Sequence, residues 1–232
     1  MKKLGIIAGI GPESTIQYYR SIISQYQEKL NTKDYPEITL HSINMTKMLN
    51  YVFQEDLDGL VAFLQARVQV LEKAGANLAV LASNTPHIVF DELAKKVNIP
   101  LISIVKETCK YVAGKGLKRV SLFGTQSTMS KGFYQKKAGL HGLEIIAPGK
   151  NQQAYIHDKY MNELVFDDIN PETKKRLVSI AQGQIESDNI QGLILGGTEL
   201  PLILKQEDFP NLQVFDTTQI HVQSIVKRMT ED

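Results

Sequence analysis

The sequence predicts an α/β protein in which mostly parallel sheets are flanked by helices. Short apolar runs alternate with longer helical patterns along the 232 residues, and such alternation is typical of βαβ units. The apolar runs are nearly continuous, as expected for parallel strands that are covered on both faces. The alternation starts again near the middle of the chain, which indicates two similar lobes.

The first half carries four apolar runs separated by helical patterns. We expect strands at residues 4–8, 37–43, 78–82 and 101–104, and helices at 12–30, 57–74 and 89–96. In the helix at 12–30, the period predicts one apolar face that carries Ile16, Tyr19, Ile23 and Tyr26. Gly75 is a natural stop for the helix that precedes it.

The second half repeats this order, with expected strands at 119–123, 144–146, 192–195 and 212–215 and expected helices at 128–138, 174–186 and 219–229. Residues 5–9 resemble residues 120–124, and residues 78–85 resemble residues 192–199. These matches indicate a duplicated unit with a pseudo-twofold cleft, although buried parallel strands also resemble one another without duplication. We place the first lobe at 1–115, with a last helix at 217–232 packing back on it, and the second at 116–216.

Composition excludes several classes of function. The net charge is +1 and no basic stripe carries interleaved aromatics, so we expect neither nucleic acid nor membrane as a partner. Cys109 is the single cysteine, so the chain forms no internal disulfide, which fits a reducing compartment. Gly11 and Pro12 end the first apolar run too early for a signal peptide, and we expect a cytoplasmic protein. The five histidines lack metal-ligand spacing, so no metal is expected.

Two loops of the first half carry polar residues where ligands bind in open parallel sheets, after the carboxyl ends of strands. In residues 9–15, glycines including Gly11 let a ligand approach the backbone, and the following helix N-terminus can hold an anion. The GxGxxG spacing breaks at Ser14, which disfavours a dinucleotide cofactor. Residues 83–87 read Ser-Asn-Thr-Pro-His, and the alternative is helix capping by Asn84 or Thr85.

Two loops of the second half are similar. Residues 124–129 offer backbone donors and two threonine hydroxyls, with an N-cap at Ser127 or Thr128 as the alternative. Residues 196–201 begin with two glycines that permit close approach to the backbone. Their alternative is a plain turn with Glu199 at a helix N-terminus, where the helix dipole favours an acid.

Together these loops resemble the aspartate/glutamate racemase family of cofactor-independent amino-acid racemases. The segments that carry the resemblance are GIIAGIGPEST at 5–15, SNTPH at 83–87, GTQSTM at 124–129, LGGTELP at 195–201 and VFDTTQIH at 214–221. The resemblance covers nearly the whole chain. It implies two Rossmann-like lobes, a ligand cleft between them, usually a homodimer, and no cofactor.

The resemblance also implies a mechanism from which this chain departs. Family members remove the Cα proton with a cysteine on one face and return a proton from a second cysteine on the other. By position these cysteines fall at Ser83 and Gly197. A serine hydroxyl ionises far less readily than a thiol, and glycine has no side chain to act. We therefore expect full two-base racemisation to be weak or absent.

Three interpretations remain. The chain is a variant of an active aspartate or glutamate racemase, or other groups have taken over proton transfer, with His87, Glu199 and His157 as candidates. Alternatively it is a non-catalytic protein that binds a small dicarboxylate. Residues that match family substrate contacts are Asn84, Thr85, Thr125, Thr128 and Thr198. Lys47 and Lys159 are the nearest candidates for the side-chain carboxylate, although Lys47 on a solvated loop is an equal alternative.

Overall fold

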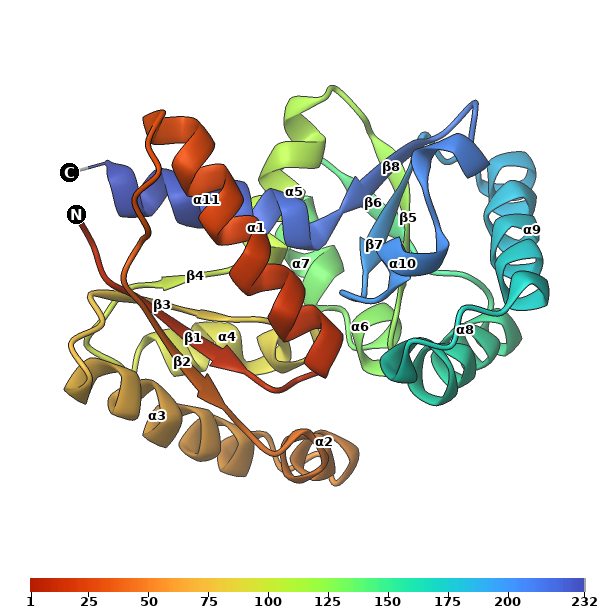
Figure 1. Cartoon of the computed structure of the whole chain (residues 1–232). Coiled ribbons are helices and arrows are strands. Elements are labelled where there is room, and N and C mark those ends of the chain that lie inside the picture. The colour runs from red at the N-terminus through yellow and green to blue at the C-terminus, as the bar shows by residue number, and fades with distance from the viewer. Residues whose placement is uncertain (232) are drawn as a thin grey trace. The chain divides into compact units, whose positions relative to one another are not determined.

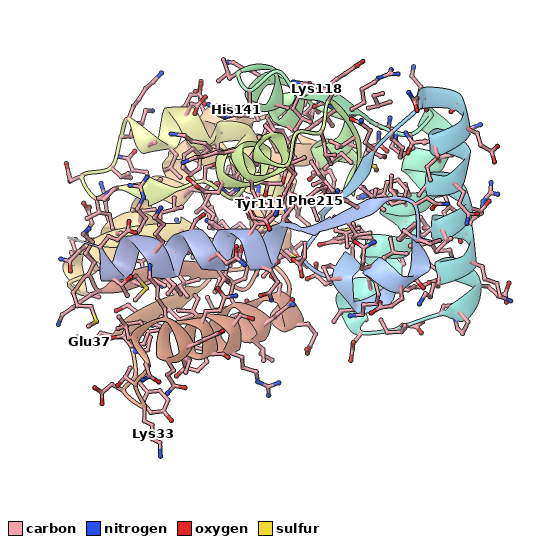
Figure 2. All side chains as sticks on the ribbon, turned by 90° about the horizontal axis from the view of Figure 1, so that it is seen from above. Lys33, Glu37, Tyr111, Lys118, His141 and Phe215 are labelled. Atoms are coloured by element: carbon pink, nitrogen blue, oxygen red, sulfur yellow. The ribbon has the colours of Figure 1, made fainter. Side chains whose placement is uncertain are left out.

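The computed structural model describes residues 1–231 and divides the chain into two compact units (Figure 1). The first unit comprises Met1–Ile104 and the segment that begins at Thr218, and the second comprises Val105–Thr217. After its first residue, helix α5 (Ile104–Gly114) therefore belongs to the second unit, whereas the predicted first lobe ran to residue 115. One contact that holds it there is the edge-on packing of Tyr111 against Phe215, whose ring centroids lie 6.3 Å apart (Figure 2).

The first unit contains a parallel four-stranded sheet in the order β2-β1-β3-β4. Its strands are β1 (Leu4–Ala8), β2 (Ile38–Ser42), β3 (Leu78–Leu81) and β4 (Leu101–Ile102). Its helices are α1 (Pro12–Leu30), α2 (Met45–Phe53), α3 (Leu57–Lys73), the 3-10 helix η1 (Thr85–Val89), α4 (Phe90–Ala94) and α11 (Thr217–Thr230).

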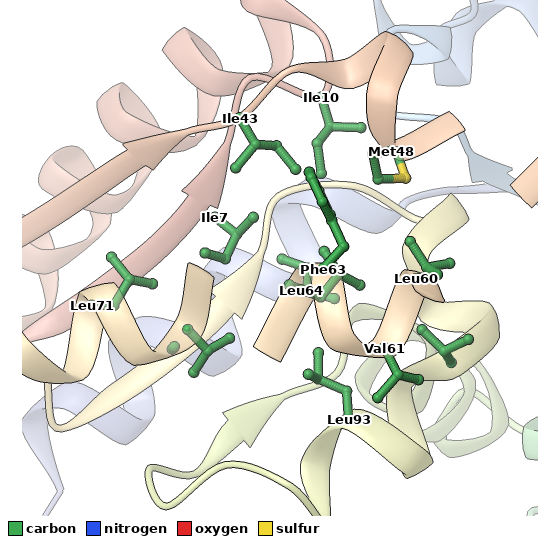
Figure 3. Packing of buried hydrophobic residues seen from close by; sticks show 14 of the residues in the cluster. Ile7, Ile10, Ile43, Met48, Leu60, Val61, Phe63, Leu64, Leu71 and Leu93 are labelled. Atoms are coloured by element: carbon green, nitrogen blue, oxygen red, sulfur yellow. The ribbon is translucent and has the colours of Figure 1, made fainter. Parts of the chain in front are cut away.

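Two apolar clusters cover the two faces of this sheet. Alternate strand residues point to opposite faces, so Ile7 packs with α2, α3 and α4 while Leu4 and Ile6 pack with α1 and α11. Figure 3 shows Phe63 and Leu64 of α3 at the centre of the first of these clusters. Burial on both faces explains why the strands are continuous apolar runs.

The second unit repeats the topology with the order β6-β5-β7-β8. Its strands are β5 (Arg119–Gly124), β6 (Glu144–Ile146), β7 (Gly192–Gly196) and β8 (Gln213–Asp216). Besides α5, its helices are α6 (Gln126–Ser130), α7 (Phe133–Gly139), α8 (Lys150–Asn162), η2 (Leu164–Phe166), α9 (Pro171–Asp188), α10 (Leu200–Ile203) and η3 (Gln206–Asp208). The two matched sequence pairs fall on β1 with β5 and on β3 with β7, so the predicted two-lobed parallel fold is confirmed.

The predicted face of helix α1 is correct only at Tyr26. Tyr18, Ile22 and Tyr26 are buried, whereas Ile16 and Tyr19 are exposed. The sequence contains two apolar stripes on this helix. The buried stripe contains Tyr18, whose hydroxyl forms a 2.8 Å hydrogen bond with His221 Nδ1 on α11.

Other element boundaries also differ. The helix expected at 128–138 is two helices, because Gly132 takes a left-handed conformation as the N-cap of α7. Helices α2 and α8 were not predicted, and α8 lacks a strong apolar period because most of its residues are polar. Lys47 therefore lies in the first turn of α2 rather than in a loop.

Candidate functional site

In the first unit, the loop after β1 is shaped by two glycines with positive φ, Gly9 at 76° and Gly11 at 96°. A side chain at Gly9 would collide with Ser42 and with the backbone of Ile43. The Thr15 hydroxyl accepts from the Gly9 N–H and donates to the Gly11 carbonyl, both at 2.9 Å. Gly11 is also the N-cap of α1 and offers no side chain to cap it, so the helix N-terminus can receive an anion.

The loop after β3 keeps its polar side chains buried. Ser83, Asn84 and Thr85 are each less than a tenth exposed. Asn84 is the N-cap of η1, but its side chain makes no capping hydrogen bond, so capping does not account for it. Ser14 of α1 donates to the Ala82 carbonyl at 3.2 Å and ties this loop to the loop after β1. Gly11, Ser83, Asn84 and Thr85 thus follow neighbouring strands at the same sheet edge.

His87 lies beneath this loop in a buried position. Its Nε2 accepts from the Ile104 N–H at 3.3 Å, so its Nδ1 carries the proton in the neutral ring. Its ring stacks on Phe90 with centroids 4.9 Å apart. Burial, and then the nearby His221, lower the pKa of His87 to about 3. This environment favours a packing role for His87 over the predicted role in proton transfer.

His221 was not singled out in the sequence, yet it is the neighbour of His87. It lies on α11, its Nε2 is 3.0 Å from the Ile102 carbonyl oxygen, and the two imidazole centroids are 6.5 Å apart. Burial lowers the pKa of His221 to about 4. Two neutral imidazoles therefore contact the backbone at the end of β4 and just after it.

In the second unit, the loop after β5 is built on a pair of buried threonines. Thr125 is the N-cap of α6, and its Oγ1 accepts from the Thr128 N–H at 3.2 Å. The two hydroxyl oxygens are 3.0 Å apart. The alternative of an N-cap at Ser127 or Thr128 is therefore wrong in its residue, because the extended Thr125 caps the first turn of the helix.

The loop after β7 contains Gly197, Thr198 and Glu199, all buried. A Cβ at Gly197 would overlap Cε2 of Tyr160 and would lie 3.0 Å from its Cζ. The Tyr160 hydroxyl donates to Glu199 Oε2, and the Thr198 hydroxyl donates to the same oxygen at 2.8 Å. Glu199 is the N-cap of the short helix α10, but its side chain is directed to these hydroxyls rather than to the helix N–H groups.

Tyr160 was missed in the sequence, because nothing in the polar segment that becomes α8 marks it. Burial, and then the charge of Glu199, raise the pKa of Tyr160 well above its usual value. The phenol therefore keeps its proton at neutral pH. Gly124 pairs with Gly196 across β5 and β7, so the threonine pair and Glu199 follow adjacent strands.

The surroundings of the other candidate residues do not indicate a role in binding or proton transfer. Lys47 is exposed. Lys159 forms an ion pair with Glu163 at 2.6 Å, and this hydrogen bond raises its pKa. His157 lies on α8, where burial lowers its pKa. Cys109 is buried in α5, and burial raises its pKa to about 12. Within residues 1–231, no three His, Cys, Asp or Glu side chains gather as metal ligands, and no helix could cross a membrane.

Comparison with known proteins gives a consistent result. The model of the Asp/Glu/hydantoin racemase family matches residues 7–225. RacX of Bacillus subtilis (strain 168), a broad-specificity amino-acid racemase, is 32% identical over 155 residues, which cover 65% of this chain and 66% of RacX. An aspartate racemase homologue from Pyrococcus horikoshii OT3 has a similar structure, with 37% identity, a TM-score of 0.86 and full coverage of both chains. A candidate Asp/Glu racemase from Yersinia pestis has 29% identity and a TM-score of 0.90, again with full coverage of both chains.

Proposed function

Because the chain belongs to the Asp/Glu/hydantoin racemase family, we propose that it binds a small acidic amino acid, aspartate or glutamate, and acts at its Cα. The observation that carries the proposal is the placement of polar loops at the carboxyl ends of β1, β3, β5 and β7 in a family fold. The activity differs from that of two-cysteine racemases, because Ser83 and Gly197 stand at the two family positions.

Recognition of a carboxylate is supported by donors in these loops. The N-terminus of α1 carries no side-chain cap from Gly11 and favours negative charge. Asn84 and Thr85 add polar side chains beside it, and Thr125, Thr128 and Thr198 supply hydroxyls in the second unit. Lys47 and Lys159 remain the candidates for the side-chain carboxylate. Lys159 would have to exchange its partner Glu163 for the ligand.

The ion pair between Lys159 and Glu163 favours a second substrate class, amino acids without a side-chain carboxylate. If Lys159 stays with Glu163, the site recognises only the amino group and α-carboxylate that all amino acids share. The likeness to the broad-specificity racemase RacX agrees with this alternative. A third candidate is a binding protein without turnover, which the Ser83 and Gly197 positions support.

The test combines binding with stereochemistry. We expect L- and D-aspartate or glutamate to raise the melting temperature, while chiral chromatography detects little of the opposite enantiomer. An Asn84→Ala variant should lose most of the ligand-induced shift, whereas Asn50→Ala on the exposed side of α2 should keep it. Equal shifts with neutral amino acids would select the broad class. Rapid formation of the opposite enantiomer would contradict weak racemisation, and no shift with any amino acid would contradict the function.

We also propose a cytoplasmic homodimer that needs no cofactor. The single cysteine is a buried thiol, which fits a reducing compartment. Ile16 and Tyr19 leave an apolar stripe exposed on α1, and a second copy would cover it. Sedimentation equilibrium should give twice the chain mass, and Tyr19→Glu should shift it to the monomer. A monomeric parent protein would contradict the proposal.

A further inference from the structure

The space beside Gly197 is filled from another element. The ring of Tyr160 on α8 lies against Gly197 so closely that a Cβ would be 3.0 Å from Cζ and 3.1 Å from Cδ2, with Cε2 nearer still. Real Cβ atoms essentially never come as close to another atom as this one would to Cε2, and a buried aromatic ring cannot move aside freely. In this packing, any side chain at position 197 would therefore have to displace the Tyr160 ring.

The tyrosine brings a chemical group as well as volume. Its hydroxyl donates to Glu199 Oε2, which also accepts from Thr198 Oγ1 at 2.8 Å. Tyr160 and Glu199 are 7% and 1% exposed, so their shared proton is largely shielded from water. A hydroxyl held by a buried carboxylate can pass its proton to that carboxylate while it accepts another.

We propose that Tyr160 replaces the side chain missing at position 197 and relays a proton between the ligand Cα and Glu199. The inference rests on the proposed function, because it needs an amino acid bound with its Cα next to the Tyr160 hydroxyl. The overlap with Gly197 and the hydrogen bond to Glu199 identify this tyrosine.

The step balances without a charged phenol. The Cα–H bond breaks, its electron pair stays on Cα as a carbanion delocalised into the ligand carboxylate, and the proton goes to the Tyr160 oxygen. The original O–H bond of Tyr160 breaks at the same time, and that proton bonds to Glu199 Oε2. The raised pKa of Tyr160 supports this concerted form, since the phenol is neutral before and after the step. The proton held by the pair exchanges with solvent through the small exposed part of Tyr160, and the reverse transfer then returns a solvent-derived proton to the same face of Cα.

A relay on one face exchanges the Cα hydrogen but retains the configuration. Inversion needs a second group on the opposite face, and Ser83 is a poor base. The expected activity is therefore deuterium incorporation from D₂O without a matching amount of the other enantiomer.

The experiment follows aspartate or glutamate in D₂O by proton NMR and by chiral chromatography. The wild-type protein should wash out the Cα proton with retention, and Tyr160→Phe should slow the washout by about 100-fold or more, because general acid–base groups contribute that much. Glu199→Gln should slow it similarly. The matched control is Tyr111→Phe, whose hydroxyl is removed from a half-exposed ring that packs on Phe215 in the same unit (Figure 2). It should exchange at the wild-type rate.

The possible outcomes separate the proton relay from the proposed function. Exchange at the wild-type rate in a folded Tyr160→Phe variant overturns the relay and leaves the proposed function intact. If Tyr160→Phe does not fold, wild-type exchange in Glu199→Gln overturns it instead. A wild-type protein that binds the amino acid but exchanges nothing also overturns the relay, whereas a protein that binds no amino acid overturns the proposed function. Inversion as fast as exchange contradicts transfer on one face.

Discussion

The two units have the same strand order, but they fill the ends of equivalent strands in different ways. After β3, the loop itself supplies buried polar side chains at Ser83, Asn84 and Thr85. After β7, the loop supplies the buried Thr198 and Glu199, but glycine stands at position 197, and Tyr160 from α8 occupies the space beside it. A duplicated topology thus determines where a site forms, while the element that provides the functional group is free to change.

The buried ionisable side chains near these two loops also differ. The first unit places two neutral imidazoles, His87 and His221, under its strand ends. The second unit places the phenol of Tyr160 against Glu199. Burial disfavours the charged form in both cases, so the first unit should be sensitive to acid and the second to alkali.

The largest effect is expected for the imidazole pair in acid. The pKa values of His87 and His221 are lowered to about 3 and about 4, so the unfolded state binds protons first as the pH falls below about 6.5. Their contribution to stability is complete above that pH and is lost progressively toward pH 4. At pH 5 each ring should lower the free energy of unfolding by about 2 kcal/mol, as measured by urea denaturation at several pH values. Titration of either buried imidazole near pH 6.5 in NMR spectra of the folded protein would contradict the prediction.

The next effect compares the two family cysteine positions directly. Gly197→Cys should lower the free energy of unfolding by about 2–3 kcal/mol, because the new side chain overlaps Tyr160 in a packed interior. Ser83→Cys should change it by less than about 1 kcal/mol, since the loop already accommodates a side chain of similar size. Thermal and urea unfolding of both variants measure the difference.

A second substitution sharpens this comparison. In a Tyr160→Ala background the overlap is gone, so Gly197→Cys should cost much less than in the parent protein. Equal costs in both backgrounds would show that Tyr160 does not fill the space in solution.

A smaller effect is expected in alkali. The pKa of Tyr160 is raised, so its contribution is complete below pH 10, the ordinary tyrosine value, and is lost as the pH rises above it. Urea unfolding should show a lower free energy of unfolding at pH 11 than at pH 9, and Tyr160→Phe should remove that difference. An alkaline loss of the same size in Tyr160→Phe would assign the effect to another group.

Much of the fold follows from the sequence because its strands are buried on both faces. The runs at β1, β3, β5 and β7 are continuous and apolar, and the two internal matches align them in the duplicated order. The face of α1 was not predictable, because Ile16 and Tyr19 form a stripe as regular as the buried one. Packing against the sheet and α11 selects between them.

The candidate site was predictable where it depends on strand ends. Asn84, Thr125 and Thr198 lie after their strands, as the pattern indicates. Tyr160 was not predictable, since its approach to Gly197 depends on how α8 packs in the second unit. The ion pair between Lys159 and Glu163 depends on the same unpredicted helix.

The smallest effect is expected at the single cysteine, and it separates this chain from racemases that use thiols. Cys109 is buried in α5, and burial raises its pKa to about 12, so the thiolate is scarce at neutral pH. A thiol reagent such as DTNB should release no chromophore from the native protein but one equivalent after denaturation. Cys109→Ala should likewise leave Cα exchange unchanged. Loss of exchange on thiol modification of the folded protein would assign the chemistry to Cys109 and would leave the Tyr160–Glu199 pair with a structural role only.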